Sequence, residues 1–350
     1  MASPKYVANG TYGCVMRPHI PCSKKTEKHD GSKISKLFTN FYEAISETET
    51  VEKIIGEIDP NFHFTIKLHD LCDTIASNFP KQELSKCRNF KDKNTSKLKQ
   101  IVYEYGGIDL IMAAKTISFE EIFFNLENIF QGLIMLCDAK YAHLDIKPAN
   151  IVYNQESKKM ALIDFGLCTN LQAVYTHDLL FALATDYPYY PPEFKNVVNL
   201  LRGERLTKTP WANLDYLHDR LKSDIFDRLQ LDMLKASYMD FYKSISSQET
   251  INKQKEFIKT HANKIDVYMM GCTILHIMSI CENSNTASAN SEFNAQVLNL
   301  VENMIYMNPI KRLDPKNALL AYLKIKNKMK TTFLKNVVPL MNNTRNVQSI

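Results

Sequence analysis

Four polar residues near the middle of the chain could do chemistry together. Asp145, Lys147 and Asn150 stand in one short motif, HLDIKPAN, and Asp164 opens a D-F-G triplet further on. An aspartate can accept the proton of an attacking hydroxyl, and a lysine can offset the charge that develops on a transferred phosphoryl group. Asparagine and aspartate supply the hard oxygen ligands that magnesium prefers. The set indicates phosphoryl transfer from a metal-bound nucleotide to a hydroxyl.

These two motifs resemble the catalytic loop and the metal-binding segment of eukaryotic-type protein kinases. A β-branched run over 151–153 follows the first motif, and apolar residues 160–163 lead into the second, as in that family. The resemblance implies that Asp145 and Lys147 are catalytic and that Asn150 and Asp164 bind the metal. Lys147 in D-x-K-P-x-N is similar to the serine/threonine-directed subgroup.

The resemblance extends over roughly residues 5–325 and implies an α+β, two-lobed protein-kinase-like fold. A small β-rich N-lobe is expected over 1–105 and a large α-helical C-lobe over 106–330, with a tail over 331–350. The C-lobe is expected to contain a helical insertion at about 194–265, where a partner could bind. The cleft between the lobes is expected to hold Mg-ATP.

A glycine-containing turn near the amino terminus is the predicted phosphate loop. Residues 5–20 follow a β-turn-β pattern with Gly10, Gly13 and Val15 at positions of the family motif, while Ala8 replaces its first glycine. Glycine suits such a loop because its bare backbone N–H groups can approach phosphate closely. All four positions are therefore predicted to line the ATP site.

A lysine and a glutamate are expected to form the next part of the nucleotide site. The strand-like segment 33–38 offers Lys36 for the α- and β-phosphates, with Lys33 as the alternative. Residues 40–58 repeat apolar side chains at helical spacing and carry four acids in reach, Glu43, Glu47, Glu49 and Glu52. In the kinase family an apolar residue one turn after the paired glutamate packs into the lobe interior. Only Glu47, followed by Val51 and Ile54, fits that pattern, so the resemblance implies that it is the partner of the lysine.

Residues 100–110 resemble the strand and hinge that join the kinase lobes. Backbone groups of Glu104 and Tyr105 are expected to meet adenine, Tyr103 to guard the inner pocket and Asp109 to reach the ribose. Upstream, alternation predicts a strand over 62–68, and the polar, lysine-rich residues 73–99 indicate a long surface loop.

Several residues of the larger lobe match family positions with supporting roles. His143 opens the catalytic motif, and Asp266 is expected to brace the backbone of that loop. Glu193 ends a P-P-E triplet that resembles the end of the activation segment. The resemblance implies that Glu193 and Arg312 form a buried ion pair.

Two departures from the family pattern affect regulation and substrate positioning. Leu144 stands where many such kinases have an arginine that binds a phosphate on the activation loop. This predicts activity that does not depend on phosphorylation of that loop. Asp186, next to Thr185, stands where a peptide-orienting threonine is usual, seven positions before Glu193.

Composition excludes some other classes of protein. The chain has 350 residues, 45% hydrophobic and 23% charged, with a net charge of +5. These values are ordinary for a soluble globular protein and give no case for nucleic-acid binding. No apolar run is long enough to predict a transmembrane segment. The eight cysteines lack metal-ligand spacing, so neither a zinc site nor a disulfide framework is predicted, and a reduced, cytoplasmic protein is expected.

The predicted function is an ATP-dependent serine/threonine protein kinase that uses Mg²⁺, or alternatively Mn²⁺, and acts on protein substrates. Segments 14–18 and 58–60, the short N-lobe, Cys22 and a composition rich in Lys, Asn and Ile are similar to divergent kinases of large DNA viruses, which implies host cytoplasm or the virion. One alternative is a pseudokinase that acts as a nucleotide-binding scaffold. Another is a phosphotransferase for small molecules.

Overall fold

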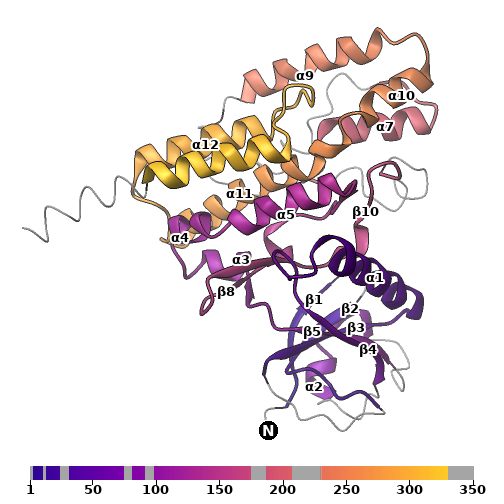
Figure 1. Cartoon of the computed structure of the whole chain (residues 1–350), viewed down its shortest axis with the longest axis vertical. Helices are drawn as coiled ribbons and strands as arrows, with labels where there is room; N and C mark the ends of the chain where they lie inside the picture. The colour runs from indigo at the N-terminus through magenta and orange to yellow at the C-terminus, as the bar shows by residue number, and fades with distance from the viewer. Residues whose placement is uncertain are drawn as a thin grey trace, which may run out of the picture. The chain divides into compact units, whose positions relative to one another are not determined.

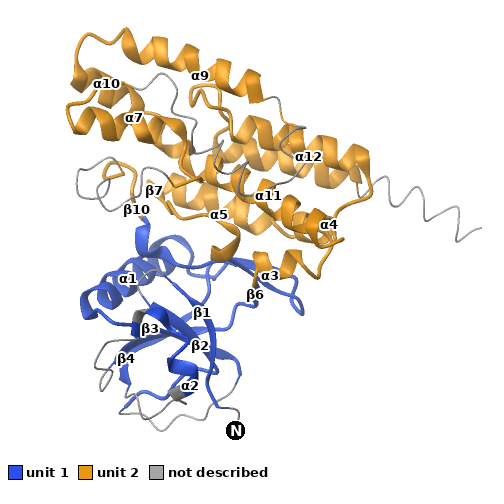
Figure 2. Cartoon of the chain, turned by 180° about the vertical axis from the view of Figure 1, so that it is seen from behind, with its two compact units in different colours: residues 1–108, 151–168 blue, residues 109–150, 169–350 orange. Residues whose placement is uncertain are grey.

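A computed structural model describes residues 3–10, 13–23, 31–74, 81–90, 98–174, 187–206, 229 and 231–329. The chain divides into two compact units (Figure 1; Figure 2). Unit 1 comprises residues 1–108 and 151–168, and unit 2 comprises 109–150 and 169–350. The division differs from the predicted lobes because the segment 151–168, expected in the larger lobe, makes its contacts with the amino-terminal unit.

Unit 1 is built on an antiparallel sheet that has five strands among the described residues, in the order β1-β2-β3-β5-β4. The strands are β1 (Lys5–Asn9), β2 (Gly13–Arg17), β3 (Lys33–Phe38), β4 (Leu68–Thr74) and β5 (Leu98–Glu104). Helix α1 (Phe41–Lys53), continued by a π-helical turn over Ile54–Ile58, packs on this sheet. Its amino terminus is capped by Asn40, whose side chain accepts a hydrogen bond from the Tyr42 N–H.

A second, smaller hairpin completes unit 1. Strands β8 (Ile151–Asn154) and β9 (Lys159–Leu162) pair antiparallel, and a 3₁₀ turn over Phe165–Leu167 follows them. Strand β9 is tied to the rest of the unit because the Leu162 N–H donates to the Phe64 carbonyl at 2.8 Å. The two strands confirm the β-turn-β pattern that was predicted between the two catalytic motifs.

The strand predicted over 62–68 is wrong, since the strand observed is β4 at Leu68–Thr74. Residues 62–65 instead wrap around the buried carboxylate of Asp59. That carboxylate accepts the backbone N–H groups of His63, Phe64 and Thr65 at 2.6–2.9 Å, and Phe62 takes a positive φ of 52°. The loop predicted over 73–99 contains a short helix, α2 (Lys81–Leu84), and a 3₁₀ turn over Arg88–Phe90.

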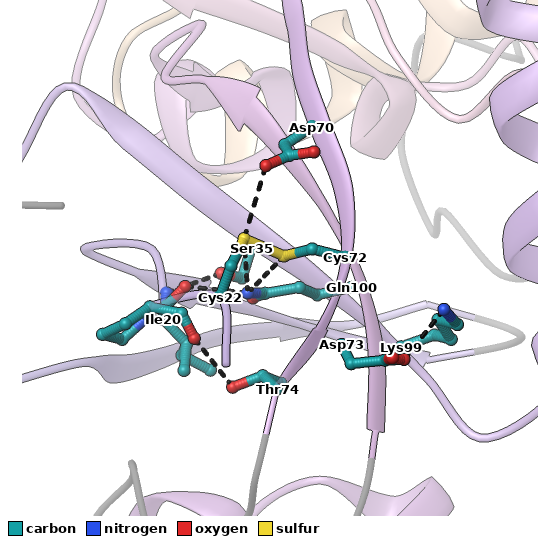
Figure 3. The surroundings of a disulfide bond; sticks show 10 residues. Ile20, Cys22, Ser35, Asp70, Cys72, Asp73, Thr74, Lys99 and Gln100 are labelled. Carbon is teal, nitrogen blue, oxygen red and sulfur yellow. Dashed lines mark hydrogen bonds and ion pairs between the residues drawn. A yellow bond between two sulfur atoms is a disulfide. The ribbon is translucent and has the colours of Figure 1, made fainter. Parts of the chain in front are cut away.

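Two disulfide bonds join segments of unit 1 that are distant in sequence. Among the described residues, which include all eight cysteines, Cys14 pairs with Cys87 and Cys22 pairs with Cys72. Figure 3 shows the second bond, where the Gln100 side chain donates to the Ile20 carbonyl at 2.8 Å beside the two sulfur atoms. The prediction of no disulfide framework is therefore wrong, and the ground for expecting a reduced protein is removed.

Unit 2 is helical, and other helices of the unit pack around one long buried helix. The helices are α3 (Leu110–Ala114), α4 (Phe119–Phe124), α5 (Glu127–Asp138), α7 (Pro192–Leu201), α9 (Leu231–Ser246), α10 (Ile251–Lys259), α11 (Ile265–Asn283), α12 (Ser291–Met304) and a helix over 315–329. Most residues of α11 are buried. A Cβ on Gly271 would lie 2.6 Å from the Ile305 side chain, so this glycine lets α11 pack closely against the end of α12.

Short elements carry the functional segments of unit 2. Strand β6 (Ile108–Asp109) leads into this unit, and β7 (Tyr141–Ala142) pairs with β10 (Thr169–Asn170) on either side of the catalytic motif in sequence. The insertion predicted at about 194–265 is helical where it is described, in α7, α9 and α10. Its predicted role in binding a partner stays a prediction, and the tail at 331–350 lies outside the described residues.

One helical stretch of the described chain, Ala262–Asn283, is long and apolar enough to cross a membrane by length and composition alone. Its most apolar window is 83% buried inside the protein. Burial of this kind is what the core helix of a folded domain shows, so the stretch is not a clear transmembrane span.

Candidate active site

Lys36 lies between two carboxylates in unit 1. Its Nζ is 2.6 Å from Glu47 Oε2 and 2.8 Å from Asp164 Oδ1. Burial by itself would lower the pKa of Lys36, but the charges of Asp164 and Glu47 together raise it. Lys36 is therefore a fixed cation, already oriented by two acceptors before any nucleotide binds.

The sheet and helix explain why these two residues meet. Strand β3 pairs Lys36 with Val15 on β2 and with Ile101 on β5, at the centre of the sheet. On α1, Glu47 lies on the buried face, and its side chain is only 3% exposed. The other three acids of the helix are less buried: Glu43 is half-buried, and Glu49 and Glu52 are exposed. The structure thus brings Lys36 rather than Lys33 to Glu47.

Tyr103 adds a contact to this group that the sequence did not predict. Its hydroxyl donates to Glu47 Oε1 at 3.2 Å. Burial and the charge of Glu47 raise the pKa of Tyr103, so the phenol stays protonated and can only donate here. Tyr103 on β5 therefore binds the Glu47 oxygen that Lys36 does not contact. This residue, predicted to guard the inner pocket, is thus linked through Glu47 to Lys36.

The predicted phosphate loop lies between β1 and β2. Strand register places Ala8 opposite Val15, and the Gly10 N–H donates to the Gly13 carbonyl at 2.8 Å. A Cβ on Gly13 would lie 1.6 Å from the Leu37 carbonyl oxygen, so the backbone can pass β3 only as glycine. The turn residues 11–12 lie outside the described part of the chain.

In the predicted hinge, backbone groups that were expected to bind adenine form hydrogen bonds within the protein. The Glu104 N–H donates to the Lys67 carbonyl at 2.9 Å, and the Tyr105 N–H donates to the Ser32 carbonyl at 2.7 Å. Only the carbonyl oxygens of these two residues could therefore serve adenine in this arrangement. Asp109, predicted to reach the ribose, caps α3 by accepting the Met112 N–H at 3.0 Å. Its role toward a nucleotide stays a prediction.

The catalytic motif of unit 2 holds the Asp145 carboxylate with several donors. Lys147 Nζ lies 2.9 and 2.8 Å from its two oxygens. Asn150 Nδ2 donates to Asp145 Oδ2 at 2.7 Å and to the Asp145 carbonyl at 2.9 Å. Because its amide nitrogen is used in this way, Asn150 presents its carbonyl oxygen away from Asp145, in an orientation that suits a metal ligand.

The backbone of this motif is fixed by Asp266 of α11, as predicted. Asp266 Oδ2 accepts the His143 N–H at 2.7 Å and Oδ1 accepts the Leu144 N–H at 3.0 Å. The Leu144 side chain is fully buried although its φ is 62°, a left-handed conformation that is strained for leucine. His143 Nδ1 accepts the Asp145 N–H at 3.3 Å, which ties the histidine to the next residue but one.

Asp164 also has a left-handed backbone, with φ of 65° and ψ of 67°. This conformation turns the chain sharply between β9 and the 3₁₀ turn that begins at the buried Phe165. The turn directs the Asp164 carboxylate toward Lys36. The roles of Asp164 and Asn150 as metal ligands stay predictions.

The predicted pair of Glu193 and Arg312 is present and completely buried. The guanidinium donates through both terminal nitrogens to the two carboxylate oxygens, at 2.6 and 3.0 Å, and both side chains are 0% exposed. Arg312 also donates through Nε to the Tyr306 carbonyl at 2.9 Å. This two-pronged geometry anchors the start of α7, directly after the P-P-E triplet.

Comparisons with known proteins agree with this geometry. The protein kinase domain family matches residues 22–199, about half of the chain. A segment of 63 residues is 38% identical to the human cell division cycle 7-related protein kinase, and 52 residues are 40% identical to the mouse protein of the same name. These segments are 18% and 15% of this chain, and they span only 10% and 9% of the length of the two relatives.

The resemblance to kinases of large DNA viruses stays a prediction, since these comparisons do not address it. The two-lobed fold that the motifs predicted is confirmed by the family match and by the division into a sheet-rich and a helical unit. The chain therefore belongs to the protein kinase domain family, whose members are phosphotransferases that use ATP and a divalent metal ion.

Proposed function

We propose that this chain is a serine/threonine protein kinase that transfers the γ-phosphate of Mg-ATP to hydroxyl groups of proteins. The observation that carries the proposal is the pair of prearranged charged groups, Lys36 with Glu47 and Asp164 in unit 1, and Asp145 with Lys147 and Asn150 in unit 2. Phosphoryl transfer depends mainly on positioning and charge neutralisation, and these groups supply both.

Unit 1 supplies the nucleotide side of the reaction. Lys36 binds the α- and β-phosphates, and Glu47 and Tyr103 keep its ammonium group in place. The β1–β2 turn around Gly10 and Gly13 covers the phosphates with backbone N–H groups. Asp164 would hold the metal ion, which would neutralise negative charge on the nucleotide phosphates.

Unit 2 supplies the hydroxyl side of the reaction. Asp145 orients the acceptor hydroxyl and takes its proton. Lys147 bonds to both oxygens of Asp145 and lies where it can offset charge on the transferred group. Asn150 orients Asp145 through its amide nitrogen and offers its carbonyl oxygen to the metal. Lys147 in this motif supports serine and threonine as acceptors.

We also propose that phosphorylation of the activation segment is not needed for activity. The side chain at 144 is apolar and fully buried, and the backbone there is held by Asp266. The catalytic motif therefore gets its shape from packing rather than from a phosphate bound by an arginine at this position. Treatment with a phosphatase should leave activity unchanged; loss of activity after that treatment would refute this part of the proposal.

The experiment that tests the main proposal is transfer of label from γ-labelled ATP to casein and to the protein itself, with Mg²⁺ and separately with Mn²⁺. Wild type should label serine or threonine, and Asp164→Ala should not. Phosphotyrosine as the sole product would contradict the acceptor class. No transfer, together with a rise in melting temperature on adding Mg-ATP, would favour a nucleotide-binding scaffold instead.

A further inference from the structure

Tyr187 places a phenolic hydroxyl on the catalytic carboxylate of unit 2. Its OH donates to Asp145 Oδ1 at 3.3 Å. This residue lies between the D-F-G and P-P-E motifs, one position after Asp186, which replaces the usual threonine. No sequence motif singled out Tyr187, because the contact joins residues 42 positions apart.

The Asp145 carboxylate has little acceptor capacity left in this arrangement. An ionised carboxylate offers about four lone-pair positions. Lys147 takes one on each oxygen, Asn150 takes a second on Oδ2 and Tyr187 takes a second on Oδ1. A substrate hydroxyl that donates to Asp145 must therefore replace one of these donors.

Of these donors, Tyr187 is the one whose replacement costs the least free energy. Its contact of 3.3 Å is the longest of the four, whereas Lys147 and Asn150 bind at 2.7–2.9 Å. Lys147 is charged, and Asn150 is bonded twice to Asp145, whereas the phenol contacts Asp145 through a neutral hydroxyl. Bonds from charged donors are stronger than bonds from neutral ones, so the phenol should yield first.

The tyrosine ring is held in place by its neighbours. It packs against Tyr189 and Tyr190 with ring centroids 5.3 and 5.1 Å away, and Tyr190 stacks on Phe194 at 4.8 Å. Phe194 follows Glu193 of the buried pair with Arg312. Burial and the charge of Asp145 raise the pKa of Tyr187, so the hydroxyl stays protonated and acts only as a donor.

We propose that Tyr187 is a positioning residue whose hydroxyl occupies the acceptor site on Asp145 until a substrate hydroxyl replaces it. The inference deepens the proposed kinase function and rests on it. The phenol orients Asp145 in the resting protein and competes with the protein substrate for one oxygen. It takes no part in moving the proton, which passes from the substrate hydroxyl to Asp145.

The kinetic test compares wild type with Tyr187→Phe, which keeps the ring and its packing and removes only the hydroxyl. With casein and Mg-ATP, KM for casein should fall about two- to tenfold, the range expected for one neutral hydrogen bond. The kcat value and KM for ATP should not change, because the phenol is displaced in both the bound complex and the transition state. Tyr190→Phe removes a hydroxyl from the same aromatic group and should keep the wild-type KM.

Two kinetic results would overturn the inference. A lower kcat with an unchanged KM for casein would mean that the phenol acts in the transition state. Unchanged kcat and KM would mean that the phenol does not compete with the substrate at all.

A measurement without turnover separates this inference from the proposed function. Melting temperatures are compared for wild type, Tyr187→Phe, Asp145→Ala and the double variant. The change in melting temperature caused by Tyr187→Phe should disappear when Asp145 is already alanine, since the two groups interact directly. If the effect is the same in both backgrounds, the inference fails, even where the wild type transfers phosphate. If wild type transfers none but the coupling is present, the proposed function fails and the contact stands.

Discussion

The cysteines before and after residue 108 are in opposite states. The four cysteines before residue 108 form two disulfides, whereas the four that follow are free thiols, and all eight are among the described residues. Two of the free thiols, Cys272 and Cys281, lie in the core of α11. Burial raises the pKa of Cys272 to about 12 and that of Cys281 to about 11, so both stay protonated and unreactive.

The two units also build their cores differently. Unit 2 wraps helices around the buried helix α11 and an aromatic group of Phe123, Phe293 and Tyr322. In unit 1, the short stretch 81–90 packs against β1 and β2 of the five-stranded sheet. This stretch is joined to the sheet by Cys14–Cys87, by the Tyr6 N–H on Glu83 and by the Arg88 N–H on Asn9.

Cys14 follows Gly13 directly, so the first disulfide acts on the predicted phosphate loop. The nucleotide side of the proposed reaction is therefore held in part by a covalent bond that reductants can break. The hydroxyl side, in unit 2, is held by hydrogen bonds, ion pairs and packing, and its described cysteines form no disulfide. The two units should respond differently to mutation, reduction and acid.

The largest expected effect separates the two sides of the reaction. Asp145→Asn should lower kcat by about 10²–10⁴-fold, the range for general acid–base groups, and leave ATP affinity unchanged. Lys36→Met should weaken ATP binding as well, because it removes the cation between Glu47 and Asp164. Initial rates and binding of a fluorescent ATP analogue measure the two quantities. An Asp145→Asn protein that binds ATP as poorly as Lys36→Met would show that the functions are not divided in this way.

Breaking the buried ion pair should destabilise unit 2 next most strongly. Arg312→Met leaves the Glu193 carboxylate buried and unpaired, which costs about 3–5 kcal/mol of unfolding free energy. Urea denaturation measures this cost. The double variant Glu193→Gln with Arg312→Met removes the uncompensated charge and should recover part of the loss. A single variant as stable as wild type would show that the pair does not support α7.

Removing the disulfides should destabilise unit 1 selectively. Replacing Cys14 and Cys87 by serine should cost about 2–4 kcal/mol, and the same holds for Cys22 and Cys72. Only the first replacement should also weaken ATP binding, because only that bond adjoins Gly13. Cys137→Ser, at a half-buried free thiol of unit 2, is the matched control. Equal melting temperatures with and without dithiothreitol would contradict the assigned role of both bonds.

The smallest expected effect is on the stability of unit 2 at acidic pH. Burial, and then the charge of Lys264, lowers the pKa of His261 in the folded protein. The unfolded chain therefore binds a proton more readily, so stability is present above pH of about 6.5 and is lost as the pH falls below it. Melting temperatures of wild type and His261→Phe between pH 7.5 and roughly 5.5 measure this effect. The variant should lose less stability on acidification; identical curves would exclude His261 as the cause.

Local motifs allowed much of the site to be predicted. Glu47 could be chosen among four acids because the family places an apolar residue one helical turn after the paired glutamate, and the structure buries Glu47 beside Lys36. Asp266 and Arg312 were predicted because short motifs around them resemble those of the family. The structure pairs Asp266 with the His143 N–H and Arg312 with the Glu193 carboxylate. The functional roles of these residues stay predictions until they are measured.

Features that join distant segments could not be predicted in this way. The disulfides connect residues 73 and 50 positions apart, and cysteine spacing carries no information about such pairs. The contacts of Tyr103 with Glu47 and of Tyr187 with Asp145 likewise depend on tertiary packing. The strand at 68–74 was misplaced because alternation over 62–68 could not reveal that Asp59 would take up the backbone N–H groups there.

The arrangement around Lys36 has a consequence for the order in which ligands arrive. One ammonium group faces two carboxylates, so the group carries one net negative charge when both carboxylates are ionised. Free ATP, itself an anion, approaches against that charge, whereas a divalent cation is attracted by it. We expect nucleotide affinity to rise steeply with metal concentration and to be weak in a chelator. The net negative charge around Lys36 therefore favours binding of metal-bound ATP over free ATP.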